Sequence, residues 1–365
     1  MLTRIYIDNF RCFVNFEYKP EAKQLLLGAN GSGKSSLLKA IRDLKSFVKG
    51  DANPFIPSTR TRWQDRPLQV VEIEALLDRR KYEYRVEVRF ESETRQLSVS
   101  TERLKVSGAT VFELADGVIH FFSNSSNHAT SVPLETTKSA LHLSLLSNSH
   151  VRRFVEWMES VHCFRIDEYP LAMDESADRE EQQPDDELEN LAGWYRHLVQ
   201  TYPDENVRFL TSLRGALIGF QTLRLSPDEY GLRRLRADFA GPRQDRVDYA
   251  ISELSEGQRC LIALYMILHF VIARGHTVFI DEPDNFIALR EIQPWLLAAE
   301  EGVEDNDGQL IIISHHPELL NHWASTHGLR FFREDNGHVR TEKFKSDPDG
   351  ELLPSELIGR GLEDA

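Results

Sequence analysis

The chain has 365 residues and a formal net charge of −15, from 58 acidic and 43 basic side chains. This acidity excludes a protein that coats nucleic acid with its whole surface, although it is compatible with a local basic groove. A hydrophobic content of 41% is typical of a soluble globular protein with a sizeable core. Cys12, Cys163 and Cys260 form no C-x-x-C pair, which argues against a zinc site or a disulfide framework.

The sequence also bears on localisation. The N-terminus lacks the basic-then-apolar pattern of a signal peptide. The longest apolar run, Leu261 to Ala273, is interrupted by His269 and is too short to span a bilayer. Together with the cysteine pattern, these features predict a cytoplasmic protein without a membrane partner.

Two strands are predicted within residues 1–27, at the start of the chain. Ile5 and Ile7 alternate with polar residues, and the apolar run Leu25-Leu26-Leu27 closes the segment. We expect an antiparallel opening to a nucleotide-binding lobe.

Residues 28–35 match the phosphate-binding pattern G-x-x-x-x-G-K-[ST] at every fixed position, and a helical pattern follows over Ser36 to Val48. Glycines let consecutive backbone N–H groups turn towards phosphates, and the start of the helix adds a favourable dipole. Lys34 is predicted to reach the β- and γ-phosphates, and Ser35 to bind Mg²⁺. The chain is therefore predicted to bind a nucleoside triphosphate. The predicted binding residues are Gly28, Asn30, Gly31, Ser32, Gly33, Lys34, Ser35 and Ser36.

The next segments differ in their periodicity. A loop over residues 51–67 carries three arginines around Trp63, and it is either a solvated basic loop or a contact for phosphate or a partner. Strict alternation within residues 68–122 predicts several antiparallel strands. The polar residues 123–129 predict a loop, and helical spacing returns over residues 139–163.

Two segments of opposite charge follow. The acidic run over residues 174–189 predicts a mobile surface loop, with a Mg²⁺ site as the alternative. The region from Arg208 to Arg246 holds eight arginines against four acids, which indicates either a surface for nucleic acid or an acidic partner, or solvated structural arginines. Within it, Arg233, Arg234 and Arg236 form the densest cluster.

The buried strand predicted over Thr277 to Ile280 ends in Asp281 and Glu282. An acid at the carboxyl end of a parallel strand lies beside the phosphate-binding loop, so Asp281 is predicted to hold Mg²⁺ through water. Glu282 is placed to polarise the attacking water as a general base. A solvated pair of acids is the alternative.

Two further strand or helix boundaries carry polar residues. Ser255 and Gly257 begin an apolar helix, and they form either a second anion site or an ordinary helix cap. The apolar residues 310–313 precede Ser314-His315-His316-Pro317, in which a histidine can sense a γ-phosphate or be a plain loop residue.

The order and spacing of these motifs resemble the ABC-type ATPase heads of the SMC, RecF and OLD-like group. Residues 254–259 (Leu-Ser-Glu-Gly-Gln-Arg) resemble the signature motif, Asp281-Glu282-Pro283 resembles Walker B, and Ser314 to Leu320 resembles the switch-histidine segment with His315 as the match. Asn9-Phe10-Arg11 resembles the N-F-R opening of the same heads. Residues 50–250 match only loosely.

The resemblance implies an α/β fold of the ABC-ATPase type, with a mixed central sheet, an antiparallel β-rich subdomain and a helical lobe. It implies four segments: residues 1–138 and 254–345 as the two parts of the nucleotide-binding lobe, residues 139–253 as the helical lobe with its acidic loop, and residues 346–365 as a tail. Arg11 is expected near the phosphates, and Phe10 or Phe13 near the base.

The implied mechanism places two heads around two ATP·Mg²⁺. Lys34, Glu282 and His315 are the expected catalytic residues, and Ser35 and Asp281 hold the metal. Ser255, Gly257 and Gln258 would complete the site of the other head, because one head cannot close its own site.

The sequence also departs from the family pattern. Ala288 stands where transporter-type D-loops carry Asp, and Gln64 is only a weak match to the Q-loop glutamine. We find no long coiled coil and no TOPRIM-like acidic cluster after His315. The chain therefore resembles a bare ATPase head without its own nuclease.

Two functions are compatible with such a head. The first is a sensor and regulatory ATPase for a separately encoded effector, a nuclease or toxin in prokaryotic antiphage defence, like the ATPase subunits of Septu-type pairs. The second is a RecF-like ATPase that binds DNA during repair. The acidic net charge favours the first.

Overall fold

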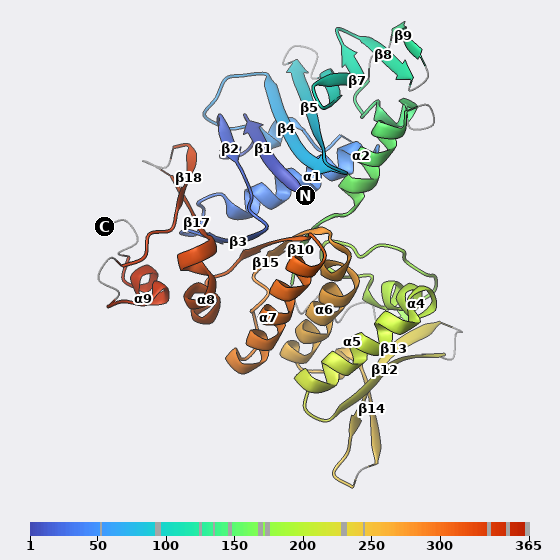
Figure 1. Cartoon of the computed structure of the whole chain (residues 1–365), viewed down its shortest axis with the longest axis vertical. Helices are drawn as coiled ribbons and strands as arrows, with labels where there is room; N and C mark the ends of the chain where they lie inside the picture. Colours follow the sequence, from blue (N-terminus) through green and yellow to red (C-terminus); the bar gives the residue numbers. More distant parts are fainter. Residues whose placement is uncertain are drawn as a thin grey trace. The chain divides into compact units, whose positions relative to one another are not determined.

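The computed structural model describes the chain apart from residues 52, 92–95, 124–125, 134–135, 145–147, 167–170, 172–175, 228–231, 244, 334–336, 348–350 and 362–365. The chain forms two compact units (Figure 1). The first unit consists of Met1–His162 and His327–Phe344, and the second of Cys163–Thr326 and Lys345–Ala365. The four segments that the family resemblance implies differ from these two units in their boundaries, and they stay a prediction.

An eight-stranded antiparallel sheet dominates the first unit, in the order β2-β1-β4-β5-β6-β7-β8-β9. Successive side chains of a strand point to opposite faces of the sheet, so every second residue lies in the core. On β5 these residues are Tyr82, Tyr84, Val86 and Val88, and all are at most 2% exposed. The strands are β1 (Leu2–Asp8), β2 (Phe16–Tyr18), β4 (Leu68–Leu77), β5 (Arg80–Glu91), β6 (Gln96–Val106), β7 (Ala109–Ala115), β8 (Val118–Ser123) and β9 (Ser126–Pro133).

Consecutive hairpins join β4 to β8, which confirms the antiparallel strands predicted over residues 68–122. The loop predicted over residues 123–129 is wrong in part, because β9 begins at Ser126 and pairs with β8. A polar strand can occupy this position because β9 is an edge strand, where backbone hydrogen bonds to one neighbour suffice. Residues 124–125 lie outside the described part of the chain.

A second group of strands in the first unit supports the phosphate-binding loop. β3 runs parallel to β17, and β17 runs antiparallel to β18 (Figure 1). The start of the chain thus has three strands rather than the two predicted, because Phe16 to Tyr18 pair with β1. The remaining elements of this unit are β3 (Lys23–Leu27), α1 (Lys34–Val48), η1 (Pro57–Thr59), η2 (Leu141–Ser144), α2 (Ser149–Glu159), β17 (Gly328–Arg333) and β18 (Val339–Lys343).

The second unit combines helices with parallel strands and a small antiparallel sheet. β15 pairs with β16 in parallel, and β13 pairs with β11, β12 and β14. β10 lies where the chain passes from the first unit to the second. The elements are β10 (Val161–Arg165), β11 (Ser176–Ala177), α4 (Leu191–Thr201), α5 (Pro203–Ala216), β12 (Phe220–Pro227), β13 (Arg233–Ala240), β14 (Arg246–Ala250), η3 (Ile251–Glu253), α6 (Glu256–Phe270), η4 (Ile272–Arg274), β15 (Thr277–Asp281), α7 (Leu289–Asp305), β16 (Gln309–Ile313), α8 (Pro317–His327) and α9 (Pro354–Gly359).

Helix α6 is the centre of the second unit and packs between α5 and α7 (Figure 1). The Nε1 atom of Trp295 on α7 donates to the Leu264 carbonyl oxygen at 2.9 Å, and Nε2 of His269 lies 2.9 Å from Oγ of Ser212 on α5. By length and composition alone, Glu256–Arg274 could cross a membrane, but 72% of this segment is buried inside the protein. We therefore assign it as a core helix.

Both charged segments contain internal hydrogen bonds or ion pairs. Residues 178–189 of the acidic run form a loop, and the Asp185 carboxylate accepts hydrogen bonds from the backbone N–H groups of Glu189 and Asn190 at 2.9 and 3.0 Å. Within the described residues, no group of three His, Cys, Asp or Glu side chains could hold a metal ion. The described part of the acidic run thus offers no support for the Mg²⁺ alternative, and residues 174–175 lie outside it.

Three of the eight arginines of the basic region, Arg224, Arg236 and Arg246, pair with aspartates of the β12–β13–β14 sheet. Asp238 is fully buried and pairs with Arg224 at 3.2 Å and with Arg246. Asp248 accepts from Arg236 at 2.7 Å and from Arg224 at 2.8 Å. These pairs favour the structural interpretation of the arginines over a dedicated binding surface.

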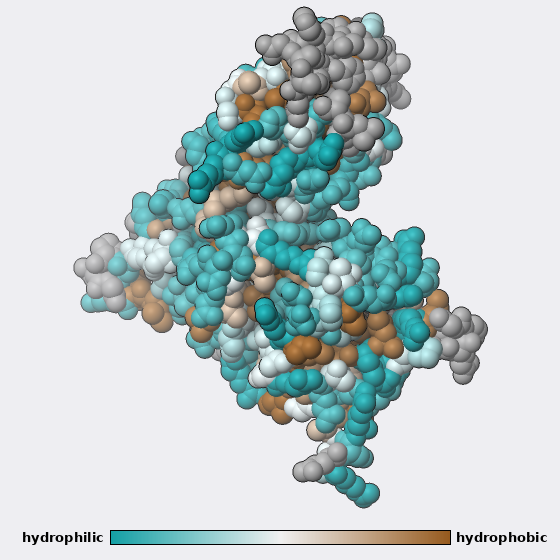
Figure 2. Space-filling model, turned by 45° about the vertical axis from the view of Figure 1, so that its right-hand side comes forward, coloured by the Kyte–Doolittle hydropathy of each residue, from teal (hydrophilic) through white to brown (hydrophobic). Residues whose placement is uncertain are grey.

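The surface is predominantly hydrophilic on the face in view, with hydrophobic residues in scattered positions (Figure 2). The large hydrophobic residues that are most exposed lie on separate elements or loops. They are Val207, Ile218, Leu143, Leu353, Phe286, Leu76, Trp63 and Leu297, each at least 48% exposed.

Candidate nucleotide-binding site

The phosphate-binding loop between β3 and α1 requires glycine at two positions. A side chain at Gly28 (φ 134°) would place its Cβ 2.1 Å from the Phe331 carbonyl oxygen. At Gly33 (φ 115°) the Cβ would lie 2.9 Å from Cγ2 of Val339. Both φ angles lie in the region that favours glycine. The backbone of the loop therefore packs directly against β17 and β18.

Lys34 is folded back across this loop. Its Nζ donates to the carbonyl oxygens of Gly28 at 2.5 Å and Ala29 at 3.3 Å, and the residue is only 6% exposed. A phosphate oxygen is a stronger acceptor than a carbonyl oxygen for an ammonium group. The lysine is thus held at the loop in a position from which it can exchange these carbonyls for a phosphate.

The start of α1 has the properties of an anion site. Gly33 is its N-cap and offers no side-chain cap, and its first turn contains no acidic residue. The first N–H groups of a helix have no intrahelical partner and carry the positive end of the dipole. Ser35 is exposed in this first turn, where a hydroxyl can reach a metal ion.

The N-F-R segment lies next to the loop, but its aromatic residues do not face solvent. Arg11 is exposed, and its backbone N–H donates to the Thr59 carbonyl at 2.7 Å. Phe10 and Phe13 are fully buried. Phe10 packs edge-on against Phe55, with 6.2 Å between the centres of the two rings. The expectation that Phe10 or Phe13 contacts the base is wrong, because both rings belong to the core.

Cys12 lies beneath the same loop. A Cβ at Gly33 would be 3.3 Å from its Sγ. Burial raises the pKa of the Cys12 thiol, while its hydrogen bond with Ser36 acts in the opposite direction. Ser36 thus contacts Cys12, the residue against which the loop packs.

In the second unit, β15 presents the two predicted acids at its carboxyl end. Glu282 follows Asp281 with a φ of 52°, which is a strained conformation for a side chain of this size. Its N–H donates to the Ile313 carbonyl at 2.8 Å, and its Oε2 accepts from Nδ2 of Asn285 at 2.8 Å. Both backbone and side chain therefore fix the direction of this carboxylate.

A third acid of this segment, Asp284, is not among the site residues that the sequence predicts. It is 7% exposed, and burial raises the pKa of its carboxyl group, although a hydrogen bond with Ser314 opposes the shift. Asp284 therefore connects the Walker B segment to the segment after β16. The signal available in the sequence was the third acid in Asp281-Glu282-Pro283-Asp284.

The two histidines after β16 have different surroundings. The N–H of His316 donates to Oγ of Ser314 at 2.9 Å, and its Nδ1 accepts from the N–H of Glu318 at 3.3 Å, so His316 helps to begin α8. His315 is exposed. Its role towards a γ-phosphate stays a prediction.

The signature segment begins α6 with a capping box. Oγ of Ser255 accepts from the Gln258 N–H at 3.3 Å, and Oε1 of Gln258 accepts from the Ser255 N–H at 3.0 Å. A Cβ at Gly257 would lie 2.6 Å from the carbonyl oxygen of Phe286, which follows Walker B. The signature and the segment after Walker B are thus in direct contact.

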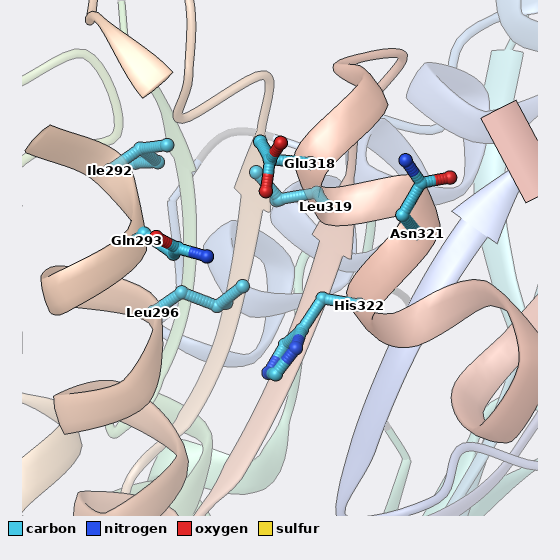
Figure 3. Close-up of a pocket in the computed structure, with 7 residues that line it drawn as sticks. All are labelled: Ile292, Gln293, Leu296, Glu318, Leu319, Asn321 and His322. Atoms are coloured by element: carbon cyan, nitrogen blue, oxygen red, sulfur yellow. The ribbon is translucent and has the colours of Figure 1, made fainter. Parts of the chain in front are cut away.

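A groove of about 180 Å³ lies between α7 and α8. Figure 3 shows Gln293 on one helix and Glu318 and His322 on the other facing this space. None of the predicted nucleotide-binding residues lines it. Its lining residues are Ile292, Gln293, Leu296, Glu318, Leu319, Asn321 and His322.

Comparison with solved structures places the chain in a class defined by its fold. An SmcHead solved with the C-winged helix domain of ScpA matches with a TM-score of 0.59 and 14% identity, covering 94% of this chain and 97% of that chain. A Pyrococcus furiosus Smc head bound to the C-terminal domain of ScpA matches with a TM-score of 0.56 and 12% identity, covering 100% and 98%. The SMC head domain from Thermotoga maritima matches with a TM-score of 0.50 and 13% identity, covering 94% and 99%. The fold is that of an SMC head domain.

The sequence also matches a family model over residues 25–321, described as "AAA domain, putative AbiEii toxin, Type IV TA system". Because this match covers most of the chain, the protein belongs to that family of P-loop ATPases. No curated protein matches the chain. The predicted resemblance to ABC-type heads of the SMC and RecF group is confirmed, as is the α/β fold class.

Proposed function

We propose that this protein binds and hydrolyses ATP, and that two copies close around two ATP·Mg²⁺. The observation that carries hydrolysis is Glu282 at the end of β15, whose strained backbone donates to the Ile313 carbonyl and whose carboxylate accepts from Asn285. Strain of this kind persists where the surrounding structure enforces it, and it is frequent at active sites. A directed carboxylate is what a general base for water requires.

The residues of each unit fit the parts of a nucleotide site. In the first unit, the glycine-lined loop, Lys34 and the start of α1 suit the β- and γ-phosphates, and Arg11 is proposed to contribute near them. In the second unit, the Asp281 carboxylate has the chemistry to hold Mg²⁺, as the Ser35 hydroxyl has in the first. When bound, Mg²⁺ neutralises charge on the β- and γ-phosphate oxygens. Glu282 would accept a proton from the attacking water, and His315 would donate a hydrogen bond to the γ-phosphate.

Closure by a second copy rests on the signature segment. Ser255, Gly257 and Gln258 begin α6 at an exposed helix start, where N–H groups and a hydroxyl can contact an anion. We propose that this surface completes the site of the other copy. The homodimer or higher oligomer follows from this arrangement.

We further propose that the ATPase is the sensor and regulatory subunit for a separately encoded effector, a nuclease or toxin in antiphage defence. Support comes from the family description, which names a toxin of a toxin–antitoxin system, and from two similar heads solved with a bound ScpA domain. The RecF-like alternative has weaker support, because Arg224, Arg236 and Arg246 of the basic region are paired with aspartates.

The test of action in trans mixes two inactive variants. Ser255→Arg blocks the helix start, and Lys34→Ala removes the phosphate contact. In the mixed dimer one site carries both defects and the other carries neither, so we expect ATPase activity to return in part. Each variant alone should be inactive. If subunit exchange is demonstrated and no activity returns, closure by a second copy is refuted.

A further inference from the structure

Trp63 is the most accessible tryptophan of the protein. It is 48% exposed, whereas Trp157, Trp194, Trp295 and Trp323 are at most 5% exposed. An exposed tryptophan leaves a large apolar ring in contact with water, which is unfavourable unless a partner covers it. Its surroundings show what kind of partner fits.

Hydrogen bonds from the Asn9 side chain fix both ends of the segment that carries Trp63. Asn9 is fully buried, and its Nδ2 donates to the carbonyl oxygens of Arg66 and Leu68, both at 2.8 Å. Its Oδ1 accepts from the N–H of Thr61 at 3.2 Å. A turn between Thr61 and Gln64, closed by a 3.1 Å backbone hydrogen bond, presents Trp63. The tryptophan is therefore positioned by the N-F-R segment rather than by a free loop.

A cation–π contact places this ring beside the phosphate-binding loop. The guanidinium carbon of Arg333 lies 5.3 Å from the centre of the Trp63 ring. Arg333 pairs with Val339 across β17 and β18, and Val339 is the residue against which Gly33 packs. The Trp63–Arg333 pair thus borders the loop within the same unit.

We propose that Trp63 stacks on the purine base of the nucleotide whose phosphates the loop binds, with Arg333 packed against the Trp63 ring. This inference rests on the proposed nucleotide binding. Phe10 and Phe13 are unavailable for this role, because both are fully buried. An aromatic ring that already carries an arginine is a stacking platform for a base, and stacking is tolerant of base identity. We therefore expect ATP and GTP to use it alike.

The experiment compares nucleotides with inorganic tripolyphosphate, which carries the phosphates without a base. In Trp63→Ala, we expect the affinities for ATP and GTP to fall about tenfold, which is about 1.4 kcal/mol and within the range measured for base stacking on aromatic side chains. Tripolyphosphate affinity should stay unchanged. Trp63→Phe keeps an aromatic face and should retain most of the affinity.

Tryptophan fluorescence gives a second, direct readout. Because the other four tryptophans are buried, ATP should quench the emission of Trp63 in the wild-type protein, and tripolyphosphate should not. The ATP-dependent change should disappear in Trp63→Phe. Loss of this difference between the two ligands contradicts stacking.

The outcomes separate this inference from the function on which it rests. If Lys34→Ala loses both ATP and tripolyphosphate but Trp63→Ala binds ATP like the wild type, stacking is refuted and nucleotide binding stands. If Trp63→Ala instead loses affinity only for a single-stranded oligonucleotide, the ring is a nucleic-acid contact and the inference is wrong. If Lys34→Ala binds ATP like the wild type, both the proposed nucleotide binding and the stacking of Trp63 on the base are refuted.

Discussion

Glu102 on β6 offers a quantitative test of how the first unit responds to pH. Its carboxylate is fully buried and accepts three hydrogen bonds, from Tyr84 Oη at 2.7 Å, Ser139 Oγ at 2.5 Å and the Ala140 N–H at 2.7 Å. Burial raises the pKa of this carboxyl group from 4.5 to about 7, although the three donors act in the opposite direction. The charged form is therefore disfavoured in the folded protein.

The direction of the pH dependence follows from proton binding. Because the folded protein binds this proton more tightly than the unfolded chain, the contribution to stability is full below pH 4.5. It is lost as the pH rises to about 7. The shift corresponds to about 3 kcal/mol, since one pKa unit is worth about 1.4 kcal/mol.

Glu102→Gln should remove this dependence without leaving a polar atom unpaired. The amide oxygen can accept from the Ala140 N–H, and the amide nitrogen can donate to the hydroxyl oxygens of Tyr84 and Ser139, since hydroxyls act in either role. Urea unfolding at pH 5 and pH 7.5 measures the effect. We expect the wild type to lose about 2 kcal/mol more than the variant between these two values, because the unfolded chain has already released most of this proton at pH 5.

The matched control is Glu113→Gln on the neighbouring strand. Glu113 pairs with Arg103 at 3.8 Å, and its side chain is 30% exposed. This variant should keep the pH dependence of the wild type. Identical pH dependence in Glu102→Gln and the wild type would refute the assignment of the buried carboxyl as its source.

Two further predictions concern catalysis. Glu282→Gln should keep ATP binding but slow turnover about 100-fold or more, because the base is lost; unchanged steady-state hydrolysis would contradict its role. Gly257→Ala should reduce ATPase activity in a protein that remains folded, since the new Cβ displaces the Phe286 carbonyl. Gly215→Ala on α5, which meets no atom within 4 Å, is the control and should retain activity.

The sequence predicted best where local chemistry alone decides the structure. Residues 28–35 can serve few purposes other than phosphate binding, and alternation in residues 82–88 permits little besides a strand with one buried face. The strand that ends at Asp281 and the helix that begins at Ser255 follow in the same way. Whether these segments act in one nucleotide site depends on the distances between them, and a single sequence does not contain those distances.

What escaped prediction depends on residues distant in the chain. Phe10 and Phe13 are suitable base-stacking residues by type, but they pack against core rings such as Phe55. Arg224 and Arg246 of the basic region pair with Asp238, which becomes buried only when β12, β13 and β14 pair. Glu102 lies in an alternating strand like its neighbours, and only the segment around Ser139 makes it unusual.

The support of the phosphate-binding loop has a consequence for synthesis on the ribosome. The hairpins from β4 to β9 join neighbours in the sequence, so this sheet can form while the chain is still growing. β3 and the loop pack against β17 and β18, which are among the last strands to be made. Until those strands emerge, Gly28 and Gly33 lack the backbone and side chain that shape the loop. A nascent chain should thus acquire its nucleotide affinity late, which keeps an incomplete head from capturing ATP.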